Sequence, residues 1–124
     1  MTILVVEDEQ IILKTILKKM ELKDVTGVGV ENGQKAFEYL NNEDNQLPDL
    51  IWLDYHLPDM NGIKFMDMLR QDDRIKDIPV IVVSNSANNE TMKDMMLLGI
   101  KDYYVKAEQK LDDLIEGALE LTNN

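Results

Sequence analysis

Five short apolar segments of the chain have the pattern of buried β-strands. They cover residues 3–6, 25–30, 50–53, 80–83 and 103–105, and each is rich in β-branched or aromatic side chains. Between them, apolar residues recur at intervals of three and four, which is the spacing of a helix with one covered face. The pattern therefore predicts five strands that alternate with five helices.

Each predicted helix has an apolar stripe. The stripes contain Ile16 in the first helix, Phe37 in the second, Met66 in the third, Met95 in the fourth and Leu114 in the fifth. Most of the eight methionines fall in the third and fourth helices, where we interpret them as core filling rather than as a pliable docking face. The stripes indicate that every helix packs on a sheet.

Four glycines refine this prediction. Gly99 follows the fourth helix and is expected to cap it in the left-handed conformation. Gly27 and Gly29 weaken the second strand, which favours a place at the edge of the sheet. Gly117 lowers the helix propensity of the last helix by about 1 kcal/mol relative to alanine.

Strict alternation of strand and helix requires a parallel sheet covered on both faces, because each right-handed crossover lays its helix on the sheet. The predicted class is therefore α/β with a doubly wound sheet. A chain of 124 residues and 14.3 kDa fits one domain, and no linker rich in proline, glycine or serine divides it. We expect residues 1–124 to be a single domain.

The composition excludes several classes of protein. Thirteen basic against 24 acidic residues give a net charge of −11, which a nucleic acid backbone would repel. The absence of cysteine excludes disulfides and thiol chemistry and is compatible with a cytoplasmic protein. No apolar run approaches the roughly 20 residues of a membrane helix. We expect a cytoplasmic protein that binds neither nucleic acid nor membrane.

Chemically active residues follow four of the five predicted strands. Glu7 and Asp8 follow the first, Asp54 the third, Ser84 the fourth and Lys106 the fifth. Doubly wound sheets bind ligands at the carboxyl ends of their strands. If the first and third strands are neighbours, three carboxylates converge there, and their repulsion is costly unless a cation intervenes.

Magnesium is the cation that this set of residues favours, because Mg²⁺ prefers a few carboxylates completed by water and phosphate. Calcium is disfavoured by the absence of a sequential ligand loop, and zinc by a lone His56 without cysteine. With Lys106 and Ser84 the site suits phosphoryl transfer to Asp54. Taken alone, Asp54 is equally well explained as a cap of the next turn, but the whole set favours phosphate.

Four motifs in order resemble the receiver domains of two-component response regulators. They are residues 3–9 (ILVVEDE), 50–62 (LIWLDYHLPDMNG), 79–84 (PVIVVS) and 99–106 (GIKDYYVK). The resemblance spans essentially the whole chain and is closest to single-domain chemotaxis regulators with no effector domain. It implies a (βα)5, flavodoxin-like fold with strand order 2-1-3-4-5.

The resemblance also implies roles for particular residues. Asp54 would accept the phosphoryl group, and Mg²⁺ or Mn²⁺ would be held by Asp8, Asp54 and the backbone carbonyl of His56. Glu7 would act on the cation through water, and Lys106 would contact the phosphoryl group.

A second group of residues would form the switch. Ser84 would hydrogen-bond the phosphoryl group, and Tyr103 would turn inward when Ser84 moves. His56 and Ser86, two residues beyond Asp54 and Ser84, would influence the phosphoryl lifetime. For the His56 side chain, a solvated loop position is an equally good interpretation.

The implied function is that of a signalling protein and not an enzyme, since it would catalyse only its own phosphorylation and dephosphorylation. The donor would be a histidine kinase or histidine phosphotransfer protein. Output would pass by contact with a target protein through the fourth and fifth helices and the fifth strand, as a monomer or as a phosphorylation-dependent dimer.

Three residues depart from the family pattern. Glu7 stands where aspartate is common, and Asn85 where a small residue is typical. Ala107 follows Lys106 where proline is usual, and a cis bond there would cost about 3–4 kcal/mol without proline.

Other functions remain open on the residues alone. Ala107 is the best support for a phosphate-independent docking module. A magnesium-dependent phosphohydrolase would need an acid at the position of His56 and a cap insertion that the chain lacks. A flavodoxin-type electron carrier is disfavoured because residues 7–9 (EDE) would repel its phosphate.

Overall fold

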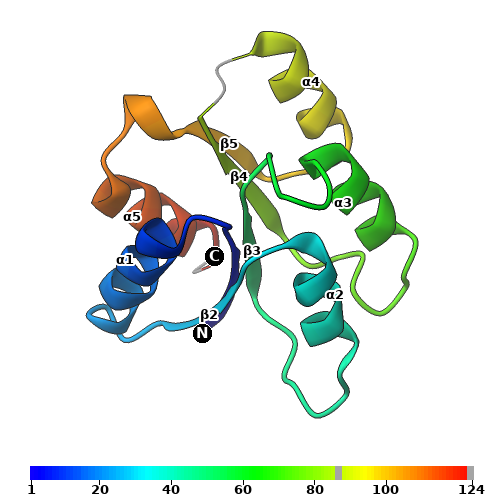
Figure 1. Cartoon of the computed structure of the whole chain (residues 1–124), viewed down its shortest axis with the longest axis horizontal. Coiled ribbons are helices and arrows are strands. Elements are labelled where there is room, and N and C mark those ends of the chain that lie inside the picture. Colours follow the sequence, from blue (N-terminus) through cyan, green and yellow to red (C-terminus); the bar gives the residue numbers. More distant parts are fainter. Residues whose placement is uncertain (86–87, 123–124) are drawn as a thin grey trace.

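The computed structural model describes residues 1–85 and 88–122, and in it five strands alternate with five α-helices, as predicted (Figure 1). The strands are β1 (Thr2–Val6), β2 (Thr26–Val30), β3 (Leu50–Leu53), β4 (Val80–Ser84) and β5 (Asp102–Val105). The helices are α1 (Gln10–Glu21), α2 (Gly33–Asn41), α3 (Gly62–Arg70), α4 (Asn89–Leu97) and α5 (Leu111–Thr122), with a 3₁₀ turn η1 (Lys106–Glu108) before α5. No helix in these ranges has the length and apolarity needed to cross a bilayer.

The strands form one parallel sheet in the order β2-β1-β3-β4-β5, which confirms the predicted fold class and strand order. β2 lies at one end of the sheet, as its glycines predicted. β1 and β3 are central neighbours, and their register pairs Val6 with Leu53. The next residue of each strand, Glu7 and Asp54, is therefore brought to the same end of the sheet.

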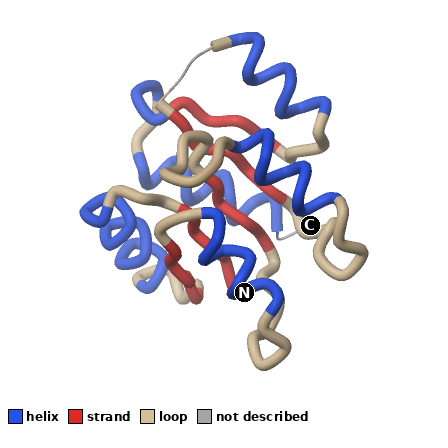
Figure 2. Tube along the Cα trace, turned by 45° about the vertical axis from the view of Figure 1, so that its right-hand side comes forward, coloured by secondary structure: helices blue, strands red, loops and turns tan. Residues whose placement is uncertain are grey.

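Helices cover both faces of the sheet. α1 and α5 lie on one face, and α2, α3 and α4 lie on the other (Figures 1 and 2). Residues of the central strands alternate between the two cores: Ile3, Val5, Leu50 and Trp52 face α1 and α5, while Leu4, Val6, Ile51 and Leu53 face the other helices. All eight are at most 1% exposed, and burying a side chain of this kind stabilises the fold by about 1.5–3 kcal/mol.

Helix α1 packs unusually close to the edge strand β2. A Cβ atom on Gly27 would lie 2.7 Å from a methyl carbon of Leu17, and one on Gly29 would lie 2.9 Å from Leu13. A larger residue at either position would require the Leu13 and Leu17 side chains to shift. At the end of α4, Gly99 has φ +92°, so the predicted left-handed cap is confirmed.

Candidate functional site

Three carboxylates meet at the carboxyl ends of β1 and β3. Glu7, Asp8 and Asp54 each offer an oxygen, and these oxygens lie within 4.8 Å of one another. The backbone fixes two of the three: the Glu7 N–H donates to the Val30 carbonyl and the Asp54 N–H to the Val6 carbonyl, each at 3.0 Å. The convergence that strand order implied is confirmed.

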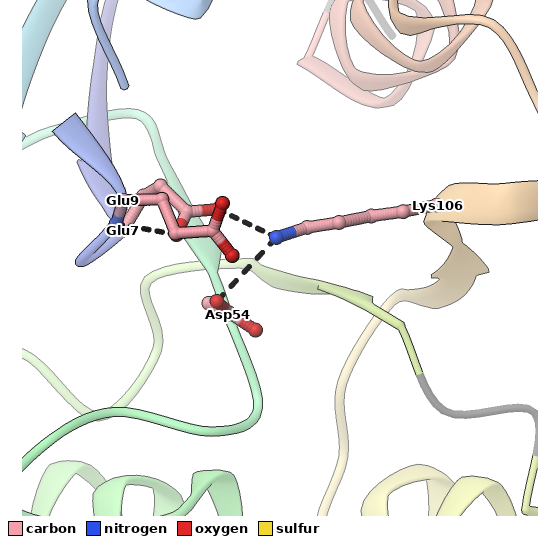
Figure 3. Close-up of polar contacts among 4 residues, drawn as sticks. All are labelled: Glu7, Glu9, Asp54 and Lys106. Atoms are coloured by element: carbon pink, nitrogen blue, oxygen red, sulfur yellow. Dashed lines mark hydrogen bonds and ion pairs between the residues drawn. The ribbon is translucent and has the colours of Figure 1, made fainter. Parts of the chain in front are cut away.

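Lys106 lies between two of these carboxylates (Figure 3). Its Nζ is 2.6 Å from Glu7 Oε1 and 3.4 Å from Asp54 Oδ2. The other oxygen of Glu7, Oε2, accepts a hydrogen bond of 3.1 Å from the Glu9 backbone N–H. Glu7 is fully buried, but both of its oxygens have protein partners, and the Lys106 ammonium compensates its charge.

Burial and charge shift the pKa of two site residues. Desolvation raises the pKa of Asp54 from 3.8 to about 7; Lys106 acts to lower it, and Glu7 raises it further. For Lys106, burial acts to lower the pKa, but the hydrogen bond to Glu7 and the charge of Asp54 outweigh this, so the pKa is raised. The Lys106 ammonium is therefore charged at neutral pH, whereas burial and the neighbouring Glu7 oppose the ionisation of Asp54.

The site suits a divalent cation. With three carboxylates ionised and one ammonium, its charge is −3 + 1 = −2, which one divalent ion cancels. The cluster offers only oxygen ligands, which are the ligands that Mg²⁺ and Mn²⁺ prefer. Asp8 is exposed to solvent, while Asp54, the residue after β3, is buried.

The loop after β3 is fastened to α2 by Asp59. Its Oδ1 accepts a hydrogen bond of 3.0 Å from the Gly33 N–H, and its Oδ2 one of 2.8 Å from the Gln34 N–H. A carboxylate at this position satisfies N–H groups that have no partner within the helix and complements the helix dipole. Sequence reasoning missed this role of Asp59, although the first turn after Asn32-Gly33 needs such a partner.

Met60 completes the contact between loop and helix. A Cβ atom on Gly33 would lie 2.5 Å from Met60 Sδ, so a larger residue there would require the Met60 side chain to shift. The Leu57 N–H donates to the Met60 carbonyl at 3.1 Å, and Asn61 Oδ1 caps α3 by accepting from the Lys64 N–H at 2.9 Å. The loop is thus held at α2, within itself and at α3.

His56 contributes through its backbone. Its N–H donates a hydrogen bond to the Asp54 carboxylate, which lowers the pKa of Asp54. The imidazole is exposed and lies edge-on to the buried Tyr55 ring, with ring centroids 4.8 Å apart and an interplanar angle of 84°. The predicted role of the His56 backbone carbonyl in cation binding stays a prediction.

The remaining predicted residues lie on or beside β4 and β5. Ser84 is fully buried at the end of β4 and pairs with Val105, while Tyr103 is buried two residues earlier in β5. Asn85 is exposed. Ser86 lies outside the described residues.

Lys106 reaches the site without the proline that usually follows it. The described peptide bonds are all trans, the bond from Lys106 to Ala107 included. Both residues belong to the 3₁₀ turn η1, which follows directly on β5.

Comparison with known proteins assigns the chain to a family. The family model "Response regulator receiver domain" matches residues 3–118. The chain belongs to this family. Receiver domains are phosphorylated on an aspartate, bind a divalent cation and work with a histidine kinase, so this receiver is a signalling module rather than a catalyst.

Individual relatives agree with this assignment. The chain is 30% identical over 110 residues to chemotaxis protein CheY1 of Helicobacter pylori, which covers 86% of the chain and 85% of that protein. The phosphorylated cyanobacterial phytochrome response regulator RcpA aligns with a TM-score of 0.87 and 27% identity over 99% of this chain and 94% of that chain. The Mn²⁺-bound response regulator Rcp1 aligns with a TM-score of 0.83 and 25% identity over 94% and 89%.

Proposed function

We propose that Asp54 accepts a phosphoryl group from the phosphohistidine of a sensor kinase or of a histidine phosphotransfer protein. The observation that carries this proposal is the position of its carboxylate, which is buried at the tip of β3, shares a carboxylate cluster and lies 3.4 Å from the Lys106 ammonium. Asp8 and Glu7 belong to the same site, but Glu7 is already paired with Lys106.

In this proposal a carboxylate oxygen of Asp54 attacks phosphorus, and the bond from phosphorus to the donor imidazole nitrogen breaks. The electron pair returns to the imidazole, and an acyl phosphate forms on Asp54. Lys106 offsets charge on the phosphoryl oxygens and orients them, and Ser84 donates a hydrogen bond to one of them. Mg²⁺ is the proposed cation: Asp8, Asp54 and the His56 carbonyl would hold it, with Glu7 acting through water, and it would supply further charge compensation.

The proposed output uses the Ser84 hydroxyl and Tyr103. When Ser84 moves toward the phosphoryl group, Tyr103 turns further inward and the surface of α4, β5 and α5 changes. Met96 and Leu97 on α4 are 50% and 77% exposed, which supports protein contact at this surface.

The remaining assignments follow from the same proposal. Residues 1–124 form one receiver unit, present in the cytoplasm as a monomer or a phosphorylation-dependent dimer, and it passes its signal to a target protein. His56 and Ser86 tune the phosphoryl lifetime. The phosphorylated form of RcpA and the Mn²⁺-bound form of Rcp1 support the phosphate and cation assignments.

Mass spectrometry tests the proposal directly. The protein is incubated with a small-molecule phosphodonor and Mg²⁺, and we expect a mass increment of one phosphoryl group that is lost in Asp54→Asn. The exposed carboxylate of Asp113 on α5 provides the matched control, Asp113→Asn, which keeps the increment.

Two results would contradict the proposal. No increment with any donor, including a phosphorylated histidine phosphotransfer protein, would favour a phosphate-independent docking module. Rapid turnover of unrelated phosphate esters would favour a phosphohydrolase.

A further inference from the structure

The outer edge of β2 is open. β2 ends the sheet, and its pairing with β1 runs without a bulge from Thr26 to Val30. Natural edge strands are usually protected by charged side chains, proline or a bulge. The five residues of β2, Thr-Gly-Val-Gly-Val, include no charged residue and no proline, so this edge lacks the usual protection against a further strand.

Two glycines supply the unpaired backbone groups of this edge. The Thr26 N–H donates to the Met1 carbonyl, and the Val30 carbonyl accepts from the Glu7 N–H. In a parallel ladder, alternate residues bond to the same neighbour. Gly27 and Gly29 therefore direct their N–H and C=O groups away from β1, toward the open side.

A groove runs between this edge and α1. Its helical wall is one stripe of α1, formed by Lys14, Leu17, Lys18 and Glu21, and the strand wall is residues 25–27. The groove has a volume of about 500 Å³. A second hollow of about 390 Å³ borders the same two lysines and ends at the exposed Leu22.

The lysines of the groove are poorly compensated. On the neighbouring surface, Lys19 and Lys23 are paired with Asp112 and Glu116 of α5. Lys14, by contrast, has no ion pair within the described residues. The partner of Lys18 is Glu21 at 4.0 Å, and both side chains are more than two-thirds exposed, so the pair is weak.

We propose that β2 and this groove bind an extended acidic segment of a partner protein as a sixth strand of the sheet. The backbone of the segment pairs with Gly27 and Gly29, and its carboxylates contact Lys14 and Lys18. Two lysines against one glutamate line the groove, so its local charge favours an acidic segment over a basic one. The edge supplies backbone hydrogen bonds, as in other cases of strand addition.

A second copy of the chain fits this edge less well. Antiparallel pairing of β2 with β2 of another copy has a two-fold axis perpendicular to the sheet, so the α1 helices of both copies lie on the same face. Lys14 and Lys18 of one copy then approach the same lysines of the other.

The site is separate from the proposed phosphorylation site. The groove borders the amino end of β2, whereas Asp54 and Lys106 lie at the carboxyl ends of the strands. Neither lysine contacts the carboxylate cluster. A variant of both lysines therefore tests the groove without changing the phosphorylation chemistry.

Nuclear magnetic resonance titration with a capped hexapeptide of alternating glutamate and valine provides the test. We expect the amide signals of Gly27 and Gly29 to shift and their hydrogen exchange to slow, while the amides of Thr26 and Val28, already bonded to β1, change little. The dissociation constant should rise at least tenfold in Lys14→Glu/Lys18→Glu. It should change less than twofold in the control Lys93→Glu/Lys101→Glu, whose lysines are exposed elsewhere.

Four outcomes would overturn the proposal. They are the absence of binding at millimolar peptide, equal binding of a peptide with lysine in place of glutamate, equal binding of a peptide N-methylated at alternate residues, and β2-mediated dimers in sedimentation experiments without peptide. Phosphoryl labelling of Asp54 in Lys14→Glu/Lys18→Glu should equal that of the unmodified protein, which shows that the variant is folded and active.

Discussion

The last residues of β1 and β3 and the residues that directly follow them affect stability in opposite directions. Val6 and Leu53 are fully buried, apolar and packed against α2, α3 and α4. Glu7 and Asp54, the next residues, are buried as well but carry charge. Burial stabilises the fold through the first pair, whereas it works against the charge of the second pair.

This difference shows how the sheet supports a site that is costly to build. Hydrogen bonds from the backbone of Glu7 and Asp54 extend the strand ladders and fix where the carboxylates lie. The ammonium of Lys106 compensates part of their repulsion. The apolar bodies of the strands therefore hold repelling charges in place at one edge of the sheet.

The largest expected effect on stability is in the strand body. Leu53→Ala should lower the free energy of unfolding by about 3 kcal/mol, because it removes fully buried methyl groups and leaves a cavity. Urea denaturation measures this change. Leu22→Ala is the matched control, since Leu22 is 74% exposed and its loss should have no measurable effect. Equal losses for both variants would show that burial at Leu53 does not decide the effect.

Removal of the Lys106 ammonium should be nearly as costly to stability. Lys106→Met leaves the fully buried Glu7 without its ionic partner, and we expect a loss of about 3 kcal/mol in urea denaturation. Adding Glu7→Gln in the same chain should restore more than half of this loss, because the buried charge is gone. A double variant no more stable than Lys106→Met would contradict the pairing.

A neutral side chain at the tip of β3 should stabilise the protein. The pKa of Asp54 is raised from 3.8 to about 7, so ionisation of this group destabilises the fold progressively as the pH rises from about 4 through 7. Below pH 4 the group is protonated in both states and costs nothing. In chelator-treated buffer, the stability advantage of Asp54→Asn over the unmodified protein should grow by on the order of 2 kcal/mol as the pH rises through this window.

Thermal unfolding at pH 4.5 and pH 8 checks this prediction, with the difference between variant and unmodified protein as the readout. The exposed Asp113→Asn should show a difference that does not change with pH in this range. A constant advantage of Asp54→Asn at both pH values would mean that its charge is not the cause.

The smallest expected effect is that of the divalent cation. At ten times its dissociation constant, Mg²⁺ should raise the free energy of unfolding by about 1.4 kcal/mol, because it binds only the folded cluster. Asp8→Asn should weaken the gain, and Asp113→Asn should keep it. Sodium chloride at equal ionic strength should give no comparable gain in thermal unfolding, and an equal gain would identify simple screening.

The fold followed from the sequence because each central strand is buried on both faces and reads as an uninterrupted apolar run. The glycines at 27 and 29 placed β2 correctly at the edge. Boundaries were less certain: Ser84 belongs to β4 and Asp102 to β5, since backbone pairing continues through polar residues that an apolar pattern omits.

The site was predicted only in part. The convergence of Glu7, Asp8 and Asp54 followed from strand order, because strand tips meet at one edge. The ion pair between Glu7 and Lys106 did not, since it depends on where a long side chain reaches across 99 residues of separation.

Gly117 shows the same limit on a helix. Its helix propensity predicted only a weaker α5. In the structure, a Cβ atom there would lie 3.0 Å from the hydroxyl oxygen of Tyr104, so the glycine makes room for a side chain of the neighbouring strand. Propensity scales describe the isolated helix and carry no information on such contacts.

The two hydrogen bonds that Asp59 accepts from α2 couple the loop after Asp54 to this helix. The loop that begins at Asp54 cannot shift as a unit without pulling on the first turn of α2 or breaking both bonds. A protein that binds α2 would thus be connected to the proposed phosphoacceptor through six residues, Asp54 to Asp59, and these two hydrogen bonds. A movement of the loop at Asp54 would therefore be transmitted to α2, and a partner bound at α2 would influence the position of the loop.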